Sequence, residues 1–290
     1  MTTAKTAPTL EQLREWIGRS ETRTETLAAE PVHALAATFD LDGAAIASQP
    51  LPPLWHWLYF LPRAPQRTIG QDGHPALGGF LPPVPLPRRM WAGGELTFNR
   101  GLRVGETVTK TSTISDVQHK SGRSGELWFV TVDHAYTVNG ETALKERHDI
   151  VYRAMPEKGQ PQAPRPRLEH AAQFGRTLQA DPVMLFRFSA LTFNGHRIHY
   201  DLDYVRDVEG YPGLIVHGPL QAMLTLELLR HERPQARVKR FGFRGLAPLF
   251  HQDTVSVGGM DAPDAAGKVV LWTGDDKGGQ AMSAWAEVDA

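Results

Sequence analysis

The sequence predicts an α+β fold made of two copies of one unit, in which an antiparallel sheet wraps around a central helix. Three observations support this. First, alternating runs rich in Thr and Val (106–117, 126–137 and 141–154) follow helical patterns in the first half. Second, the stretch 219–230 (PLQAMLTLELLR) has a helical period and is apolar on more than one face, which is typical of a buried helix. Third, LTFNRGLRVGETVTKT (96–111) and FGFRGLAPLFHQDTVSV (241–257) repeat one order of residues in the two halves.

The first half divides into short helical patterns, a loop and strands. Thr9 and Gln12 have the spacing of a capping box, which predicts a helix over 9–17, and 30–40 shows a second helical pattern. The aromatic cluster 54–61 (LWHWLYFL) predicts a helix or a buried turn. Residues 61–95 are rich in Pro and Gly but keep apolar side chains, so we expect an ordered loop there. Asn139-Gly140 is a hairpin turn signal between two predicted strands.

The stretch 156–166 (PEKGQPQAPRP) has four prolines and no apolar period, which indicates a linker. We therefore expect a first domain over 1–155, a linker over 156–170 and a second domain over 171–290. In the second domain the pattern predicts a strand over 184–191 (MLFRFSAL) and a polar loop over 192–213. Further strands are expected after the buried helix, over 237–244, 253–260, 268–273 and 281–288.

Composition excludes several classes of protein. The 290 residues carry a net charge of -1, from 31 basic and 32 acidic side chains, so there is no broad field to attract nucleic acid or an anionic membrane. The absence of cysteine excludes disulfides, thiolate nucleophiles and thiolate zinc sites. No apolar run approaches the roughly 20 residues of a membrane helix. Met1–Pro8 lacks the pattern of a signal peptide, so we expect a cytoplasmic protein.

Polar residues suited to acid–base chemistry gather in 189–200 (SALTFNGHRIHY), and His217-Gly218-Pro219 opens the buried helix. A helix N-terminus offers free N–H groups and partial positive charge, and Gly218 lets a ligand approach the backbone. Such a site can stabilise the enolate oxygen formed when a thioester is attacked at its β-carbon. A neutral imidazole nearby can take a proton from water.

This segment resembles the Ser-Gly-Asp-x-Asn-Pro-(aliphatic)-His motif of the MaoC-like dehydratases, which have the hotdog fold. The resemblance implies that His199 is the catalytic histidine and that the Gly218 amide, in Ile215-Val216-His217-Gly218, binds the thioester oxygen. The sequence departs from the motif where Asn194 replaces the aspartate, His196 the asparagine and Arg197 the proline. Because an amide is neither acid nor base, we expect Asn194 to hold the water and His199 to transfer the proton.

Two longer stretches are similar to one branch of this family, which has an added N-terminal hotdog. They are Leu191–Asp201 and Leu86–Gly94 (LPRRMWAGG). The branch includes type 2 hydroxyacyl-thioester dehydratases and mesaconyl-C4-CoA hydratases. The resemblance implies a double hotdog and a hydro-lyase acting on a coenzyme A thioester, with mesaconyl-C4-CoA, hydrated to citramalyl-CoA, as the favoured substrate. Alternatives are a dehydratase for linear 3-hydroxyacyl thioesters, a hotdog thioesterase and a non-catalytic acyl-CoA-binding subunit.

The remaining candidate residues have less specific signals. His196 is either a site residue or a surface histidine, His217 is expected to fix the helix start, and Asp201 either orients an imidazole or caps a turn. Candidates for binding coenzyme A phosphates or a distal carboxylate are Arg88, Arg89, Arg197 and Arg244. The aromatic cluster lines an acyl pocket or packs in the core. The spacing of the histidines matches no zinc pattern, so we expect no metal and no cofactor besides the coenzyme A of the substrate. A homodimer or higher homo-oligomer is expected.

Overall fold

The structure, a computed structural model, describes residues 7–122, 125–155 and 162–289. The first half contains α1 (Leu10–Arg14), β1 (Ser20–Thr26), α2 (Glu30–Thr38), α3 (Gly43–Ala47), the 3₁₀ helices η1 (Trp55–Leu58) and η2 (Gln66–Thr68), β2 (Arg88–Phe98), β3 (Thr107–Gly122), β4 (Gly125–Val138) and β5 (Glu141–Arg153). The second half contains β6 (Phe174–Gln179), α4 (Pro182–Leu191), η3 (Arg197–His199), α5 (Leu202–Asp207), α6 (Gly218–Glu232), β7 (Arg237–Gly245), β8 (Thr254–Asp261), β9 (Lys268–Asp275) and β10 (Gln280–Asp289).

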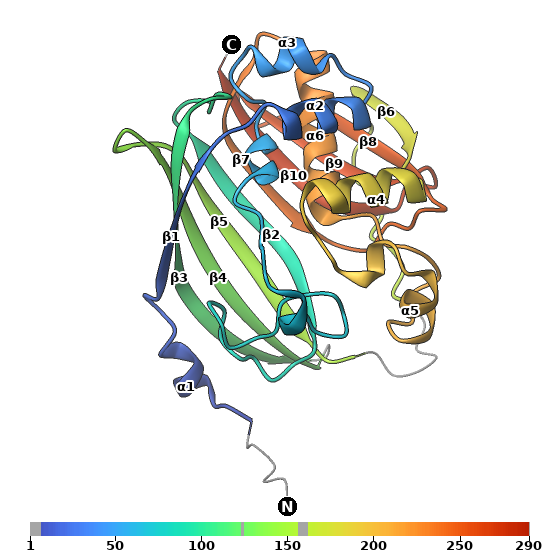
Figure 1. Cartoon of the computed structure of the whole chain (residues 1–290). Coiled ribbons are helices and arrows are strands. Elements are labelled where there is room, and N and C mark those ends of the chain that lie inside the picture. The colour runs from blue at the N-terminus through green and yellow to red at the C-terminus, as the bar shows by residue number, and fades with distance from the viewer. Residues whose placement is uncertain (1–6, 123–124, 156–161, 290) are drawn as a thin grey trace, which may run out of the picture.

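The strands form one antiparallel sheet of ten strands in the order β1-β3-β4-β5-β2-β7-β10-β9-β8-β6. Each half contributes five strands, and the order in the second half mirrors the order in the first. Pairing of β2 with β7, from Gly93–Arg244 to Thr97–Arg240, joins the two halves. Figure 1 shows the first set of strands, blue for β1 and teal to green for β2 to β5, continuing into the second set, yellow for β6 and orange to red for β7 to β10.

The repeated sequence order lies at equivalent places of the two halves, at the β2–β3 and β7–β8 connections. Even the backbone hydrogen bonds correspond. The Arg100 amide donates to the carbonyl of Ala143 on β5 at 3.1 Å, and the Ala247 amide donates to that of Ala281 on β10 at 3.1 Å. The sequence echo therefore marks one unit used twice.

The halves differ in what covers the sheet. In the second half α6 packs against β6, β8, β9 and β10, and Leu220–Leu229 is buried along its whole length, as predicted. In the first half, the corresponding stretch begins with the four-residue η1 and continues as a loop over 59–87 that is irregular except for the single turn η2. Shorter helices, α2 and α3, lie above this loop (Figure 1). The inner face of the first sheet is thus left less filled than that of the second.

Several predicted elements agree with the structure. Thr9 caps α1 in a capping box with Gln12, and Asn139 and Gly140 both have positive φ, as the tight hairpin between β4 and β5 requires. The strand predicted over 184–191 is wrong, because this stretch is α4, which Asp181 caps by accepting from the Met184 amide. Its alternating apolar residues instead divide between a buried face and an exposed one.

The structure also refines the predicted loops and linker. The ordered loop ends at Pro87 rather than at residue 95, because β2 begins at Arg88. Residues 156–161 of the predicted linker lie outside the described residues, and the division into domains stays a prediction. Within 7–122, 125–155 and 162–289, no helix combines the length and apolar character needed to cross a membrane.

We expect Leu224→Ala, in the middle of α6, to lower the free energy of unfolding by about 2–5 kcal/mol, because the cavity left in the core cannot be refilled. Leu224 is 2% exposed. The control is Ile17→Ala, because Ile17 is 41% exposed. Urea unfolding followed by circular dichroism measures both. Equal effects of the two substitutions would contradict the packing of α6.

Candidate active site

The loop between α4 and α5 carries the predicted motif. Its first turn is held by the end of α4, because the Asn194 amide donates to the carbonyl of Ser189 at 2.8 Å. Oδ1 of Asn194 accepts from the His196 amide at 3.0 Å, which closes a second turn. The chain then enters η3, so that His199 points to the buried side of the loop. The second turn is a local consequence of the Asn, because it uses the side-chain oxygen.

His199 is held in one tautomer by the backbone. Its Nδ1 lies 2.8 Å from the carbonyl oxygen of Ile215, to which it donates. Nε2 is then unprotonated and has no hydrogen-bond partner in the part of the chain that the structure describes. Burial lowers the pKa of His199 from 6.5 to about 4, although the bond to Ile215 opposes this shift. The side chain is therefore a neutral imidazole that can accept a proton at Nε2.

His217 supports the ring of His199 from one side. The two rings are stacked, with centroids 3.6 Å apart and planes at 18°. His217 is 0% exposed, and its Nε2 lies 2.9 Å from Oγ of Ser189 on α4. Burial lowers the pKa of His217 well below its ordinary value, and the nearby His199 and His196 lower it further to a smaller extent. This fits the predicted structural role at the helix start, and adds a second one, which is to fix the plane of His199.

Gly218 is the first residue of α6 and borders the same space as His199. A Cβ atom built on Gly218 would meet no other atom within 4 Å, so the backbone faces open space there. α6 directs its N-terminal N–H groups and the positive end of its dipole to this point. A thioester oxygen placed here would be stabilised as it gains negative charge.

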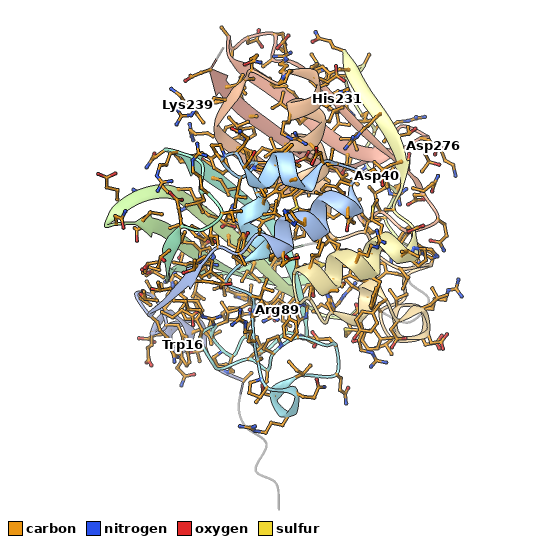
Figure 2. All side chains as sticks on the ribbon, turned by 45° about the horizontal axis from the view of Figure 1, so that its top comes forward. Trp16, Asp40, Arg89, His231, Lys239 and Asp276 are labelled. Carbon is orange, nitrogen blue, oxygen red and sulfur yellow. The ribbon has the colours of Figure 1, made fainter. Side chains whose placement is uncertain are left out.

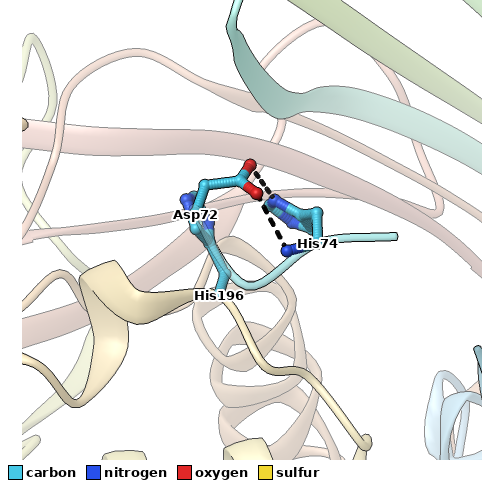
Figure 3. Close-up of side chains that lie close together, drawn as sticks. All are labelled: Asp72, His74 and His196. Atoms are coloured by element: carbon cyan, nitrogen blue, oxygen red, sulfur yellow. Dashed lines mark hydrogen bonds and ion pairs between the residues drawn. The ribbon is translucent and has the colours of Figure 1, made fainter. Parts of the chain in front are cut away.

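A loop of the first half docks on the motif loop, which the sequence did not predict. The carbonyl of Asp72 accepts from the Arg197 amide at 2.9 Å. Gly73 has φ +90°, and a Cβ atom there would lie 1.8 Å from the carbonyl oxygen of Gly195, so only glycine fits. This contact brings the ring of His74 to 4.1 Å from the ring of His196 (Figure 3). The only local signal is an Asp-Gly turn, which does not say where the turn docks.

Asp72, His74 and His196 form a cluster beside His199. Both oxygens of Asp72 accept from His74, Oδ1 from its amide at 3.0 Å and Oδ2 from its Nδ1 at 2.8 Å. The ring of His196 stands at 88° to the ring of His199, with centroids 5.5 Å apart. Each of the three side chains offers one atom that could bind a metal ion, and these atoms lie within 4.8 Å of one another.

His74 and His196 line a cavity of about 1300 Å³ between the two halves. Its wall in the second half includes Asn194, His199 and Gly218. From the aromatic cluster of the first half, Trp57, Tyr59 and Phe60 line the cavity. The strands of the first half add polar side chains, which are Arg89, Lys110, His134, Glu146 and His148. Trp55 packs in the core instead, where its Nε1 donates to Glu227 at 2.9 Å. The first half therefore shapes much of the cavity.

The four candidate arginines occupy different environments. Arg89 borders the cavity, and Figure 2 labels it near the middle of the molecule. Arg88 is buried and paired with Glu209, with Nε 2.9 Å from the carboxylate. Arg197 pairs with Asp201 at 2.7 Å on the surface, and Arg244 is exposed, so both are outside the cavity wall. Arg88 and Arg89 both border the cavity, and of these two Arg89 is the one without an ion pair among the described residues.

Asp201 does not contact the histidines of the described residues. It caps α5 by accepting from the Tyr204 amide at 3.0 Å, and its other oxygen accepts from Arg197. Of the two roles considered for it, the structure shows the cap.

The protein has well-defined relatives. The sequence model of the hydroxyacyl-thioester dehydratase type 2 family matches residues 54–251. The chain is 50% identical over 241 residues to the mesaconyl-C(4)-CoA hydratase of Chloroflexus aurantiacus, covering 81% of this chain and 84% of that protein. A solved MaoC-like dehydratase from Phytophthora capsici has a TM-score of 0.71 at 14% identity, covering 97% of this chain and 98% of that one. A Mycobacterium tuberculosis protein with a double hotdog fold has a TM-score of 0.58 at 14% identity, covering 98% and 99%. The predicted double hotdog fold is confirmed.

We expect the NMR signals of the His199 ring to stay constant as the pH falls from about 8 to about 5, because burial holds its pKa near 4. A pH titration of histidine ring protons measures this, with His199→Gln used to assign the signal. A midpoint near the ordinary value of 6.5 would contradict the buried, neutral imidazole.

Proposed function

Since the chain belongs to the hydroxyacyl-thioester dehydratase type 2 family, a family of hydro-lyases, we propose that it hydrates mesaconyl-C4-CoA to citramalyl-CoA and catalyses the reverse dehydration. One observation carries the proposal: Nε2 of His199 and the amide of Gly218 border a single cavity. The named relative with 50% identity supports this choice of substrate.

The proposed hydration begins with a water molecule held by the side-chain amide of Asn194. As the water oxygen bonds to the β-carbon, His199 Nε2 accepts one of its protons. The electron pair of the double bond moves toward the thioester oxygen, and the enolate is stabilised by the Gly218 N–H and the N-terminus of α6.

His199 then returns the proton to the α-carbon of the enolate. An imidazolium with a pKa near 4 gives up its proton readily, and the ring becomes neutral again. The product gains one water molecule in total, and the enzyme ends in its starting state. Dehydration follows the same steps in reverse. The scheme needs no cofactor besides the coenzyme A of the substrate.

Arg89 supports a dicarboxylyl substrate. Mesaconyl-C4-CoA carries a carboxylate on the β-carbon, which is the carbon that receives the hydroxyl group. A guanidinium pairs well with a carboxylate, through two parallel hydrogen bonds. Arg89 is half-buried in the cavity wall and has no ion pair among residues 7–122, 125–155 and 162–289.

Dehydration of linear 3-hydroxyacyl thioesters is the second candidate. The family description favours it, and so does the cavity of about 1300 Å³, which exceeds the need of a five-carbon acyl group. A hotdog thioesterase or a binding subunit without activity remains a distinct alternative, which the same assay separates.

We expect purified protein to remove the ultraviolet absorbance of the conjugated thioester in mesaconyl-C4-CoA, and His199→Ala to slow this about 100- to 10,000-fold. His231→Ala is the control, because His231 lies near the other end of α6 and its side chain is 78% exposed. Full activity of His199→Ala would contradict the mechanism. Release of free coenzyme A would indicate a thioesterase instead.

Asn194→Asp is expected to keep or raise the hydration rate, because an aspartate oxygen can still accept from the His196 amide and can still hold water. Steady-state kinetics with mesaconyl-C4-CoA measure the effect. Complete loss of activity would instead mean that the amide N–H groups of Asn194 are required donors.

We further propose that the enzyme acts in the cytoplasm as a homodimer or higher homo-oligomer. Closed homo-oligomers are the commonest assemblies of such enzymes, which is the support for this assembly. Light scattering on the eluted protein would give the mass, and cell fractionation would give the compartment.

A further inference from the structure

We infer that Arg89, His74 and His196 form a subsite for a carboxylate attached to the β-carbon of the acyl group. The subsite selects dicarboxylyl thioesters over simple enoyl thioesters, and in this it rests on the proposed function. His74 comes from the irregular loop of the first half, which takes the place of a central helix there. The loop is thus assigned a role in specificity.

The position of the subsite follows from the order of the rings. His196 lies between His74 and His199, with ring centroids 4.1 Å and 5.5 Å away, respectively. His199 activates the water that attacks the β-carbon, so a group bonded to this carbon has to lie next to His199. The ring of His196 is the neighbour of His199, and the ring of His74 is the next one along (Figure 3 shows His196 and His74 side by side).

The hydrogen bonds of the cluster leave donors for a ligand. His74 is fixed through its Nδ1, which lies 2.8 Å from Asp72, and its Nε2 has no hydrogen-bond partner among the described residues. The same holds for both ring nitrogens of His196. With a proton on Nε2, His74 would donate to Asp72 on one side and to the ligand on the other.

The positive charge around the cluster favours binding of an anion. Burial lowers the pKa of His74 and of His196, and the positive charge of Arg89 lowers both further. His74 and His199, and then Arg88, also act on His196 in the same direction, whereas Asp72 raises the pKa of His74. Arg88 is already paired with Glu209. Arg89 has no ion pair among the residues that the structure describes, so a substrate carboxylate would supply a negative charge beside it.

A metal ion is a different reading of the same cluster. Asp72 is its only carboxylate, and both oxygens of this residue already accept hydrogen bonds from His74. A metal ion here would add positive charge beside Arg89, whereas an anion would offset the charge of Arg89, which favours the carboxylate.

Succinyl-CoA and butyryl-CoA test the subsite without any reaction. They carry a carboxylate and a methyl group, respectively, on the same β-carbon, and neither has a double bond to hydrate. By titration calorimetry we expect the protein to bind succinyl-CoA about 100-fold more tightly. Arg89→Met and His74→Asn are each expected to remove most of this preference. Since both ligands share coenzyme A, contacts to its phosphates cancel in the ratio.

Arg67→Met is the matched control, because Arg67 is an exposed arginine of the loop that carries His74 and is not part of the cavity wall. It should keep the full preference. Titrations in two buffers of different ionisation enthalpy should show proton uptake with succinyl-CoA only, since His74 is protonated when the carboxylate binds.

Three results would overturn the inference. They are equal binding of the two thioesters by the unaltered protein, an unchanged preference in both variants, and a stoichiometric metal ion whose removal abolishes binding. Because no turnover is involved, these results are distinct from a failure to hydrate mesaconyl-C4-CoA, which would reject the proposed function alone.

Discussion

Pairing of β2 with β7 is the constraint on which the rest of the structure depends. Gly93 allows this close approach, because a Cβ atom there would lie 2.5 Å from the carbonyl oxygen of Phe243 on β7. A Cβ atom on Gly94 would lie 3.3 Å from the ring of Phe243, and 2.5 Å from the carbonyl oxygen of Arg147 on the other neighbouring strand, β5. This close approach merges two five-stranded sheets into one and places the inner face of the first beside α6 of the second. The cavity, and the docking of the Asp72 loop on the motif loop, both require that arrangement.

The chemistry of the site depends on keeping imidazoles neutral in a buried place. His199 donates to a backbone carbonyl and stacks on His217, and neither residue has a carboxylate partner among the described residues. Asn194 adds no charge to this arrangement, and an aspartate there would raise the pKa of His199 from about 4 and make it a stronger base. Asp201, the acidic residue at the end of the stretch Leu191–Asp201, is paired with Arg197 at the surface. Proton transfer is thereby concentrated on one atom, His199 Nε2.

The sequence predicted the features that have strong local signals. The period of 219–230 located α6, the Asn139-Gly140 turn located the β4–β5 hairpin, and the motif located His199 and Gly218 on one cavity. It failed where local patterns conflict with context. The alternating residues of 184–191 resemble a strand, yet the Asp181 cap starts a helix. β1 (SETRTET) was missed because it is polar on both faces, and its Thr side chains hydrogen-bond to those of β3. Asp72 and His74 were missed because their role comes from a contact with residues more than a hundred positions away.

The central claim is that His199 and Gly218 act on one thioester, and a crystal structure with bound butyryl-CoA tests it most directly. The thioester oxygen should lie about 3 Å from the Gly218 nitrogen, with the β-carbon facing His199 Nε2. A thioester bound elsewhere in the cavity, or with its oxygen turned away from the start of α6, would contradict the claim.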